Sequence, residues 1–142
     1  MTFRAVLLTQ EEKAVTAEVA DLDDDQLPEG NVSVEVSYST LNYKDGMILN
    51  GIGRLVRDYP HVPGIDFSGV VSASSDPRYS EGDRVVLTGW RVGEVHWGGY
   101  SEKARVNADW LVKLPEGVSE LDAMAVGTAG LTSMLAMQAL ED

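Results

Sequence analysis

Residues 32–38 alternate strictly between apolar and polar side chains. The segment reads Val-Ser-Val-Glu-Val-Ser-Tyr, so Val32, Val34, Val36 and Tyr38 share one face and the polar side chains share the other. A period of two over this length predicts a half-buried β-strand.

Further short apolar runs along the chain have the length and the flanking residues of strands. Turn-forming groups rich in Gly, Pro and Asp separate them, such as residues 27–30 and 81–83. The predicted strands cover residues 3–8, 14–19, 67–72, 84–87, 100–106 and 110–114. Many short strands with this punctuation predict a mainly β domain with short helices, either a small barrel or a sandwich.

The pattern changes to a helical one at Ser119. Ser119 and Asp122 resemble a capping box, with Asp in place of the usual Glu, and predict a helix start. The group Thr128-Ala129-Gly130 predicts an interruption. After it a second helix is expected to run to residue 142, with one face formed by Leu131, Met134, Leu135 and Gln138.

Composition narrows the classes of function. The chain has 142 residues, 44% of them hydrophobic, with 11 Lys plus Arg against 23 Asp plus Glu and a net charge of −12. Such a charge repels nucleic acids and anionic lipid surfaces, so neither is expected as a partner. There is no Cys and there are two His, which excludes Cys-based and His-rich metal sites.

No membrane-spanning segment is expected, because the longest apolar runs are far shorter than the roughly 20 residues that a bilayer requires. The first residues combine one positive charge with a short apolar run and lack the small-residue cleavage site of a signal peptide. A cytoplasmic protein is therefore expected.

The first chemically dense segment directly follows the alternating strand. Asn42, Tyr43, Lys44 and Asp45 place an amide, a phenol, an ammonium and a carboxylate in succession, which suits a functional site. Alternatively, Asn42 and Asp45 cap a short helix, since both accept hydrogen bonds from free N–H groups. The two interpretations are compatible.

Asp66 and two threonines mark the other two segments. Asp66 lies in a nearly apolar stretch, where a carboxylate is costly unless it pairs with a base such as Lys44 or accepts backbone N–H bonds. Thr128 and Thr132 lie about one helical turn apart around Gly130. Their hydroxyls either hold a polar group of a cofactor or cap the second helix.

Taken together in order, five blocks of the chain resemble a known superfamily. The chain is similar to the medium-chain dehydrogenase/reductases in their zinc-free quinone oxidoreductase branch, and within it to the acryloyl-CoA reductases. The blocks are Leu41-Asn42-Tyr43-Lys44-Asp45-Gly46-Met47, Val62-Pro63-Gly64-Ile65-Asp66-Phe67-Ser68-Gly69, Gly82-Asp83-Arg84-Val85, Gly98-Gly99-Tyr100-Ser101-Glu102 and Gly127-Thr128-Ala129-Gly130-Leu131-Thr132. The resemblance covers all 142 residues but only the first part of a family chain.

The resemblance implies a fold and a division into two parts. Residues 1–118 would form a GroES-like catalytic domain, a partly open β-barrel, and residues 119–142 would form the helical segment leading to a Rossmann domain absent from this chain. In zinc-dependent members a Cys ligand aligns with Asn42 and a Gly-His-Glu motif with residues 64–66. Because this chain has neither, no metal is expected.

The resemblance also implies an activity. It is the NADPH-dependent reduction of the activated C=C bond of an enoyl-CoA thioester, with acryloyl-CoA converted to propionyl-CoA. A small acyl-CoA is then the substrate, and a homodimer forms through the missing domain. The alternatives are an NADPH-dependent quinone reductase and a non-catalytic GroES-like module or fragment.

Family members suggest roles for the chemically dense residues. Five of them would lie near the nicotinamide and its ribose, namely Asn42, Tyr43, Asp45, Thr128 and Thr132. The catalytic group would consist of Tyr43, Asn42, Lys44 and Asp66. Within it, Tyr43 would be the polar group nearest the reacting atoms, while Lys44 and Asp66 would orient one another below the site.

Overall fold

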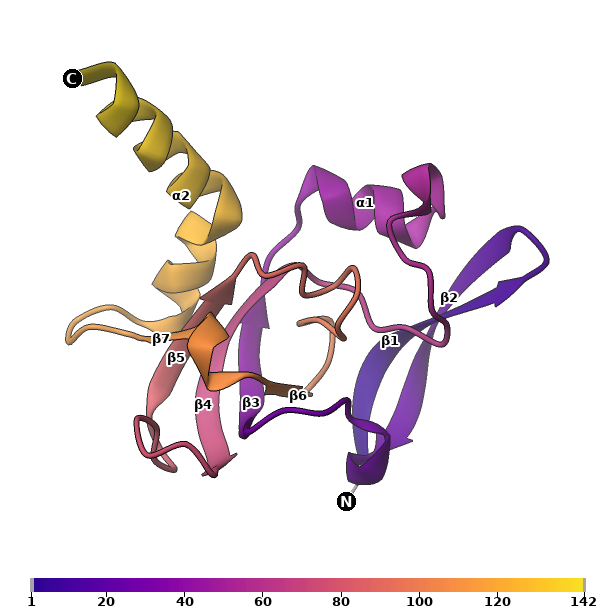
Figure 1. Cartoon of the computed structure of the whole chain (residues 1–142), viewed down its shortest axis with the longest axis horizontal. Coiled ribbons are helices and arrows are strands. Elements are labelled where there is room, and N and C mark those ends of the chain that lie inside the picture. The colour runs from indigo at the N-terminus through magenta and orange to yellow at the C-terminus, as the bar shows by residue number, and fades with distance from the viewer. Residues whose placement is uncertain (1, 142) are drawn as a thin grey trace.

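The computed structural model describes residues 2–141, which form two antiparallel sheets and two α-helices (Figure 1). The first sheet is a hairpin of β1 (Thr2–Glu11) and β2 (Ala14–Asp23). The second has the strand order β6-β3-β4-β5-β7. Its strands are β3 (Val32–Ser39), β4 (Asp66–Ser74), β5 (Arg84–Thr88), β6 (Lys103–Val106) and β7 (Leu111–Lys113). The mainly β class is confirmed.

The two sheets join along β1 to enclose a partly open barrel. The Val6 amide donates to the Tyr100 carbonyl at 2.8 Å, and the Leu8 amide donates to the His61 carbonyl at 2.7 Å. Inside the larger sheet a buried cluster includes Val34, Phe67, Val71, Val85 and Leu87. Burial of these apolar side chains is the main force that holds the barrel together.

The alternating strand keeps its predicted faces only in its first half. Val32 and Val34 are buried, Val36 is half-buried, and Tyr38 is 45% exposed. The pairing of β3 with β4 shifts register between Val36 and Tyr38, which disrupts the alternation. The predicted strand at 100–106 begins only at Lys103, because the amide of Tyr100 bonds to Pro63 in a loop.

Helix α1 (Tyr43–Leu49) covers one end of the barrel and leads into the 3₁₀ turn η2 (Ile52–Arg54). Ile48 packs there in a second buried cluster with Leu8, Val56 and Ile65. The other 3₁₀ turns are η1 (Asp24–Gln26) and η3 (Ala108–Trp110). Helix α1 is therefore held by the buried side chain of Ile48, while Tyr43 at its start is exposed.

Helix α2 (Glu120–Glu141) begins at the predicted capping box, where the Asp122 amide donates to Ser119 Oγ at 3.0 Å. Its interruption falls at Gly127 and not at residues 128–130 as predicted. Gly127 has φ 50° and ψ −162°, a conformation that essentially only glycine adopts. The chain therefore turns one residue before Thr128.

Beyond Gly127, α2 extends away from the barrel (Figure 1) and exposes apolar side chains, among them Leu131, Met134, Leu135, Met137 and Leu140. Over its 22 residues α2 is long and apolar enough, by length and composition alone, to be a candidate membrane-spanning helix, which was not expected from the sequence. However, the break leaves residues 128–141 as the regular helix, which rises only about 21 Å against a hydrocarbon core of roughly 30 Å.

Candidate functional site

Asp45 anchors the first turn of α1. Its Oδ2 accepts the Asn42 amide at 2.9 Å and its Oδ1 accepts the Ile65 amide at 3.0 Å. The side chain is completely buried. The interpretation of Asn42 and Asp45 as a helix cap is therefore confirmed, and Asp45 also joins α1 to the segment that enters β4.

Asp66, the first residue of β4, is also completely buried. Its Oδ2 accepts the backbone amide of Thr128 at 2.8 Å, and the Asn42 side-chain amide lies at 3.4 Å from Oδ1. Of the two partners predicted for this carboxylate, the backbone N–H group is the one it binds. Burial raises the pKa of Asp66, and the hydrogen bond from Thr128 partly offsets that rise.

Lys44 does not pair with Asp66, so the prediction that these two residues orient one another is wrong. The Lys44 ammonium lies 2.9 Å from Oε1 of Glu94, whose side chain is only 10% exposed. Arg91 approaches the second oxygen of Glu94 at 3.5 Å. The competing carboxylate comes from a loop 50 positions away in sequence, and it draws Lys44 to the side of α1.

Thr128 carries a buried hydroxyl, Oγ1, that has no partner within 3.5 Å among the described residues, although it lies close enough to the Asp66 carboxylate to help lower the pKa of that group. A side chain at Gly127 would lie 2.9 Å from Thr40 Cγ2 and 3.0 Å from Asp66 Oδ2, so only glycine permits this close approach. Thr132 differs from Thr128, because its hydroxyl is exposed and donates to the Thr128 carbonyl at 2.8 Å. Thr128 thus presents the unsatisfied group.

Tyr43 is 88% exposed. It is the first residue of α1, directly after Asn42, and its neighbour Leu41 is 81% exposed. Asn42, Asp45, Asp66 and Thr128 therefore form one hydrogen-bonded group, with the Tyr43 phenol exposed beside it. Lys44 makes its polar contact outside this group, and Thr132 contacts only the backbone carbonyl of Thr128.

Tyr100 belongs to the same region and was not predicted as a site residue. Its hydroxyl donates to the Thr40 carbonyl at 3.2 Å. Burial, together with the negative charges of Asp45 and Asp66, raises the pKa of Tyr100, so its phenol stays protonated. In the sequence, the preceding pair Gly98-Gly99 marks the approach of this segment to β4. A Cβ at Gly99 would lie 2.7 Å from the Asp66 carbonyl, so the two backbones pack closely there.

The arrangement offers hydrogen-bond donors and acceptors at the meeting point of α1, β4 and α2. Within residues 2–141 no three His, Asp or Glu side chains gather closely enough to hold a metal ion. Nicotinamide carboxamides, ribose hydroxyls and carbonyl oxygens are the kinds of group that such donors and acceptors bind.

Comparison with known proteins places these features in context. Residues 28–116 match the family model described as the alcohol dehydrogenase GroES-like domain. The chain is 61% identical over 142 residues to the acrylyl-CoA reductase AcuI of Ruegeria pomeroyi, covering 99% of this chain and 43% of the relative.

Two solved structures share the fold closely. The yhdH oxidoreductase of Salmonella enterica in complex with NADP is 52% identical with a TM-score of 0.95, and the match covers 98% of this chain and 43% of that one. The yhfP protein of Bacillus subtilis with NAD bound is 41% identical with a TM-score of 0.95, covering 99% and 43%. In sequence, a Bacillus subtilis relative named as the putative quinone oxidoreductase YhfP is 42% identical over 139 residues. The chain thus spans less than half the length of these relatives.

Proposed function

The chain belongs to the alcohol dehydrogenase GroES-like domain family, and we propose that it is the catalytic domain of an NADPH-dependent enoyl-CoA reductase that acts on acryloyl-CoA. The group of Asn42, Asp66 and Thr128 beside the exposed Tyr43 supports this proposal. The similarity to a protein named acrylyl-CoA reductase supports the substrate.

One observation supports the binding of a nicotinamide cofactor at this site. Thr128 Oγ1 is buried with no partner within hydrogen-bond distance in the described part of the chain, and a buried hydroxyl left unpaired costs free energy that a bound polar group recovers. Asn42, Tyr43, Asp45, Thr128 and Thr132 are the residues proposed to hold or support the cofactor. NADPH supplies the hydride when it is bound.

Tyr43 is the residue proposed to act on the substrate. Its phenol is exposed and forms no hydrogen bond with the described residues, so it is free to donate one. A thioester oxygen gains negative charge as hydride reaches the β-carbon, and a donor placed there stabilises that charge. We also propose this hydroxyl as the donor of the proton that the α-carbon takes up.

Asp66 and Lys44 act as positioning residues in this proposal. Asp66 holds the Thr128 amide and the Asn42 side chain from below, and Lys44 steadies α1 through Glu94. Hydride reduction of a double bond conjugated to a carbonyl requires such positioning and no metal.

Residues 119–142 are proposed to lead into a cofactor-binding domain. The apolar side chains exposed along α2 require a cover, and the matched region makes up only 43% of each of these relatives. The homodimer and the cytoplasmic location stay predictions.

The experiment is a substrate comparison with the protein that carries this chain and its cofactor domain. Oxidation of NADPH is followed with acryloyl-CoA, with crotonyl-CoA and with a benzoquinone, and again with NADH. The proposal expects the highest kcat/KM for acryloyl-CoA with NADPH and propionyl-CoA as the product by mass spectrometry. A higher kcat/KM for the quinone would establish the quinone reductase alternative, which the Bacillus subtilis relative favours.

The cofactor part of the proposal has its own test in Thr128→Val. Because the hydroxyl is unpaired, its removal is expected to leave the free energy of unfolding unchanged within about 0.5 kcal/mol while weakening NADPH binding about 5- to 20-fold. Ser133→Ala is the matched control, since Ser133 Oγ bonds to the Ala129 carbonyl inside α2. Equal NADPH affinity in Thr128→Val would remove Thr128 from the cofactor site.

A further inference from the structure

Three positively charged side chains in this acidic protein have no partner among residues 2–141. Seven of the 11 Lys and Arg side chains form ion pairs with Asp or Glu, and Arg105 donates to backbone carbonyls. The three that remain, Lys13, Arg54 and Arg57, form no ion pair or hydrogen bond with any residue in the range 2–141. All three line the same groove.

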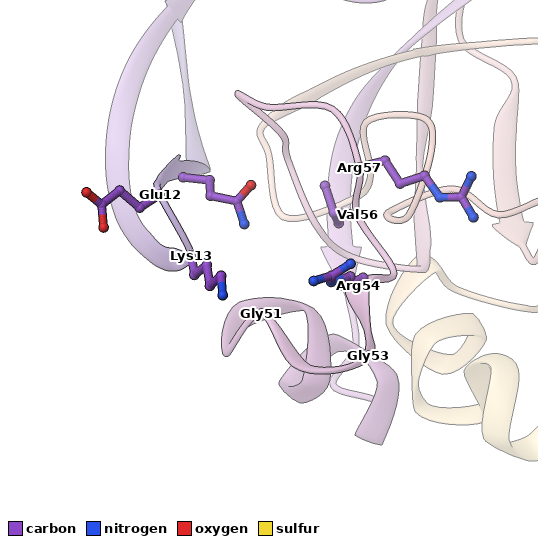
Figure 2. Close-up of a pocket in the computed structure, with 8 residues that line it drawn as sticks. Glu12, Lys13, Gly51, Gly53, Arg54, Val56 and Arg57 are labelled. Carbon is purple, nitrogen blue, oxygen red and sulfur yellow. The ribbon is translucent and has the colours of Figure 1, made fainter.

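The groove lies between the turn that joins β1 to β2 and the segment that follows α1, and its volume is about 800 Å³. Figure 2 shows the ends of Lys13 and Arg54 facing one another across it, whereas Arg57, which also lines the groove, points its guanidinium away from that gap. The Glu12 carboxylate also belongs to the lining but points away from the groove. The charge directed into the groove is therefore positive.

The backbone of the segment after α1 packs against the β1–β2 hairpin and fixes the position of Arg54 in the groove wall. Gly51 approaches the hairpin so closely that a Cβ would lie 2.8 Å from Val15 Cγ2. Arg54 has φ +48°, in the left-handed region that non-glycine residues rarely adopt. Such backbone strain is retained mainly where function requires it. An arginine kept there in a solvent-exposed turn points to a role for its side chain.

A polyanion is the ligand class that this groove fits. Two or more cations that are unpaired in the free protein bind phosphate groups without breaking existing ion pairs, and Arg and Lys are the usual ligands of phosphate. The net charge of −12 repels a polyanion elsewhere on the surface. The groove is therefore the preferred place for one.

We propose that this groove binds the phosphate groups of the CoA part of the substrate; naming CoA rests on the proposed function. Helix α1 connects the two sites, because Tyr43 opens it and the groove follows its last residue, Leu49. Seven residues of helix span about 10 Å. In CoA a pantetheine arm separates the phosphates from the thioester. A CoA ester lying along α1 therefore has its phosphates in the groove and its thioester beside Tyr43.

The kinetic test compares a complete and a truncated substrate in the protein that carries this chain and its cofactor domain. Lys13→Ala and Arg54→Ala are each expected to raise KM for acryloyl-CoA about 3- to 10-fold with little change in kcat, and Arg57→Ala, which removes a guanidinium that points away from the gap, is expected to have a smaller effect. The KM for the acryloyl thioester of N-acetylcysteamine, which has no phosphate, should not change. Arg54→Lys should recover part of the loss.

The control is Lys113→Ala, which removes a cation that is paired with Asp83. Equal effects on both substrates, or none on either, would overturn the proposal.

A binding test separates this inference from the proposed function. Adenosine 3′,5′-bisphosphate is titrated by calorimetry without turnover, and its binding should weaken in the three alanine variants. If bisphosphate binds in this way to a protein that fails to reduce acryloyl-CoA, the groove assignment stands and the proposed reaction falls. If bisphosphate does not bind, the groove assignment falls whatever the activity. If inorganic phosphate binds as tightly as bisphosphate, the groove is a site for free anions and the CoA assignment is wrong.

Discussion

Asp66 accepts a 2.8 Å hydrogen bond from the backbone amide of Thr128, 62 positions further along the chain. The residue before it, Ile65, donates its own amide to the Asp45 carboxylate of α1 at 3.0 Å. Two consecutive residues at the start of β4 therefore hold both helices. The relative position of Tyr43 on α1 and Thr128 on α2 depends on this pair.

Gly127→Ala tests how closely α2 must approach β4. The added methyl would meet Thr40 and Asp66 in a backbone conformation closed to alanine. We expect a loss of about 2–4 kcal/mol in the free energy of unfolding, measured by urea denaturation. Gly46→Ala is the control, because Gly46 lies within α1 with open space around its Cα. It should stabilise the protein by about 0.5–1 kcal/mol. A neutral Gly127→Ala would contradict the described turn.

The ion pair of Lys44 is tested by two double-mutant cycles. The cycle of Lys44→Met with Glu94→Gln should give a coupling energy of about 0.5–1 kcal/mol, because Glu94 is mostly buried but Lys44 is half-exposed. The cycle of Lys44→Met with Asp66→Asn should give a coupling near zero. A larger coupling with Asp66 than with Glu94 would restore the pairing expected from the sequence.

Asp66 should make stability depend on pH in a direction opposite to that of a paired carboxylate. Because burial raises its pKa in the folded state, the folded protein binds this proton more tightly, and the stability it contributes is lost as pH rises from about 4 through the raised pKa. Asp66→Asn cannot titrate. The free energy of unfolding of the unchanged protein, minus that of Asp66→Asn, should therefore fall between pH 4 and pH 7. A rise in this difference would show that the carboxylate is stabilised as the anion.

Tyr43→Phe tests the proposed chemistry. The exposed hydroxyl contributes little to folding, so the free energy of unfolding should change by less than about 0.5 kcal/mol. If the hydroxyl donates to the thioester or supplies the proton, kcat for acryloyl-CoA should fall about 10- to 1000-fold with little change in NADPH affinity, because the aromatic ring of the side chain is kept. An unchanged kcat would exclude Tyr43 from the mechanism and leave the fold assignment intact.

Asn42→Ala should act on the cofactor and not on the chemical step. Its side-chain amide bridges toward Asp45 and Asp66, so its loss loosens the group that carries Thr128. We expect the NADPH KM to rise about 5- to 20-fold in steady-state assays, with a smaller effect on kcat. A fall in kcat with unchanged NADPH KM would transfer the role in chemistry from Tyr43 to Asn42.

Local chemistry made part of the site predictable. Two capping contacts, Asn42 with Asp45 and Ser119 with Asp122, join residues three positions apart. Such contacts depend almost entirely on the local properties of a helix N-terminus, so the sequence predicts them. The partner of Lys44 was not predictable in this way, because Glu94 arrives from a distant loop. The position of the break in α2 also depends on tertiary contact. Gly127 and Gly130 are both candidates, and the buried Asp66 carboxylate that binds the Thr128 amide selects Gly127.

The paired anchors at Ile65 and Asp66 also have a mechanical consequence. Helix α2 extends away from the barrel after Gly127, and the first hydrogen bond after this break joins the Thr128 amide to Asp66. Since Ile65 grips α1 through Asp45, a force on α2 reaches the first turn of the helix that bears Tyr43. The start of β4 is thus a common attachment point for α1 and α2, and we expect a displacement of α2 to shift the first turn of α1 together with Tyr43.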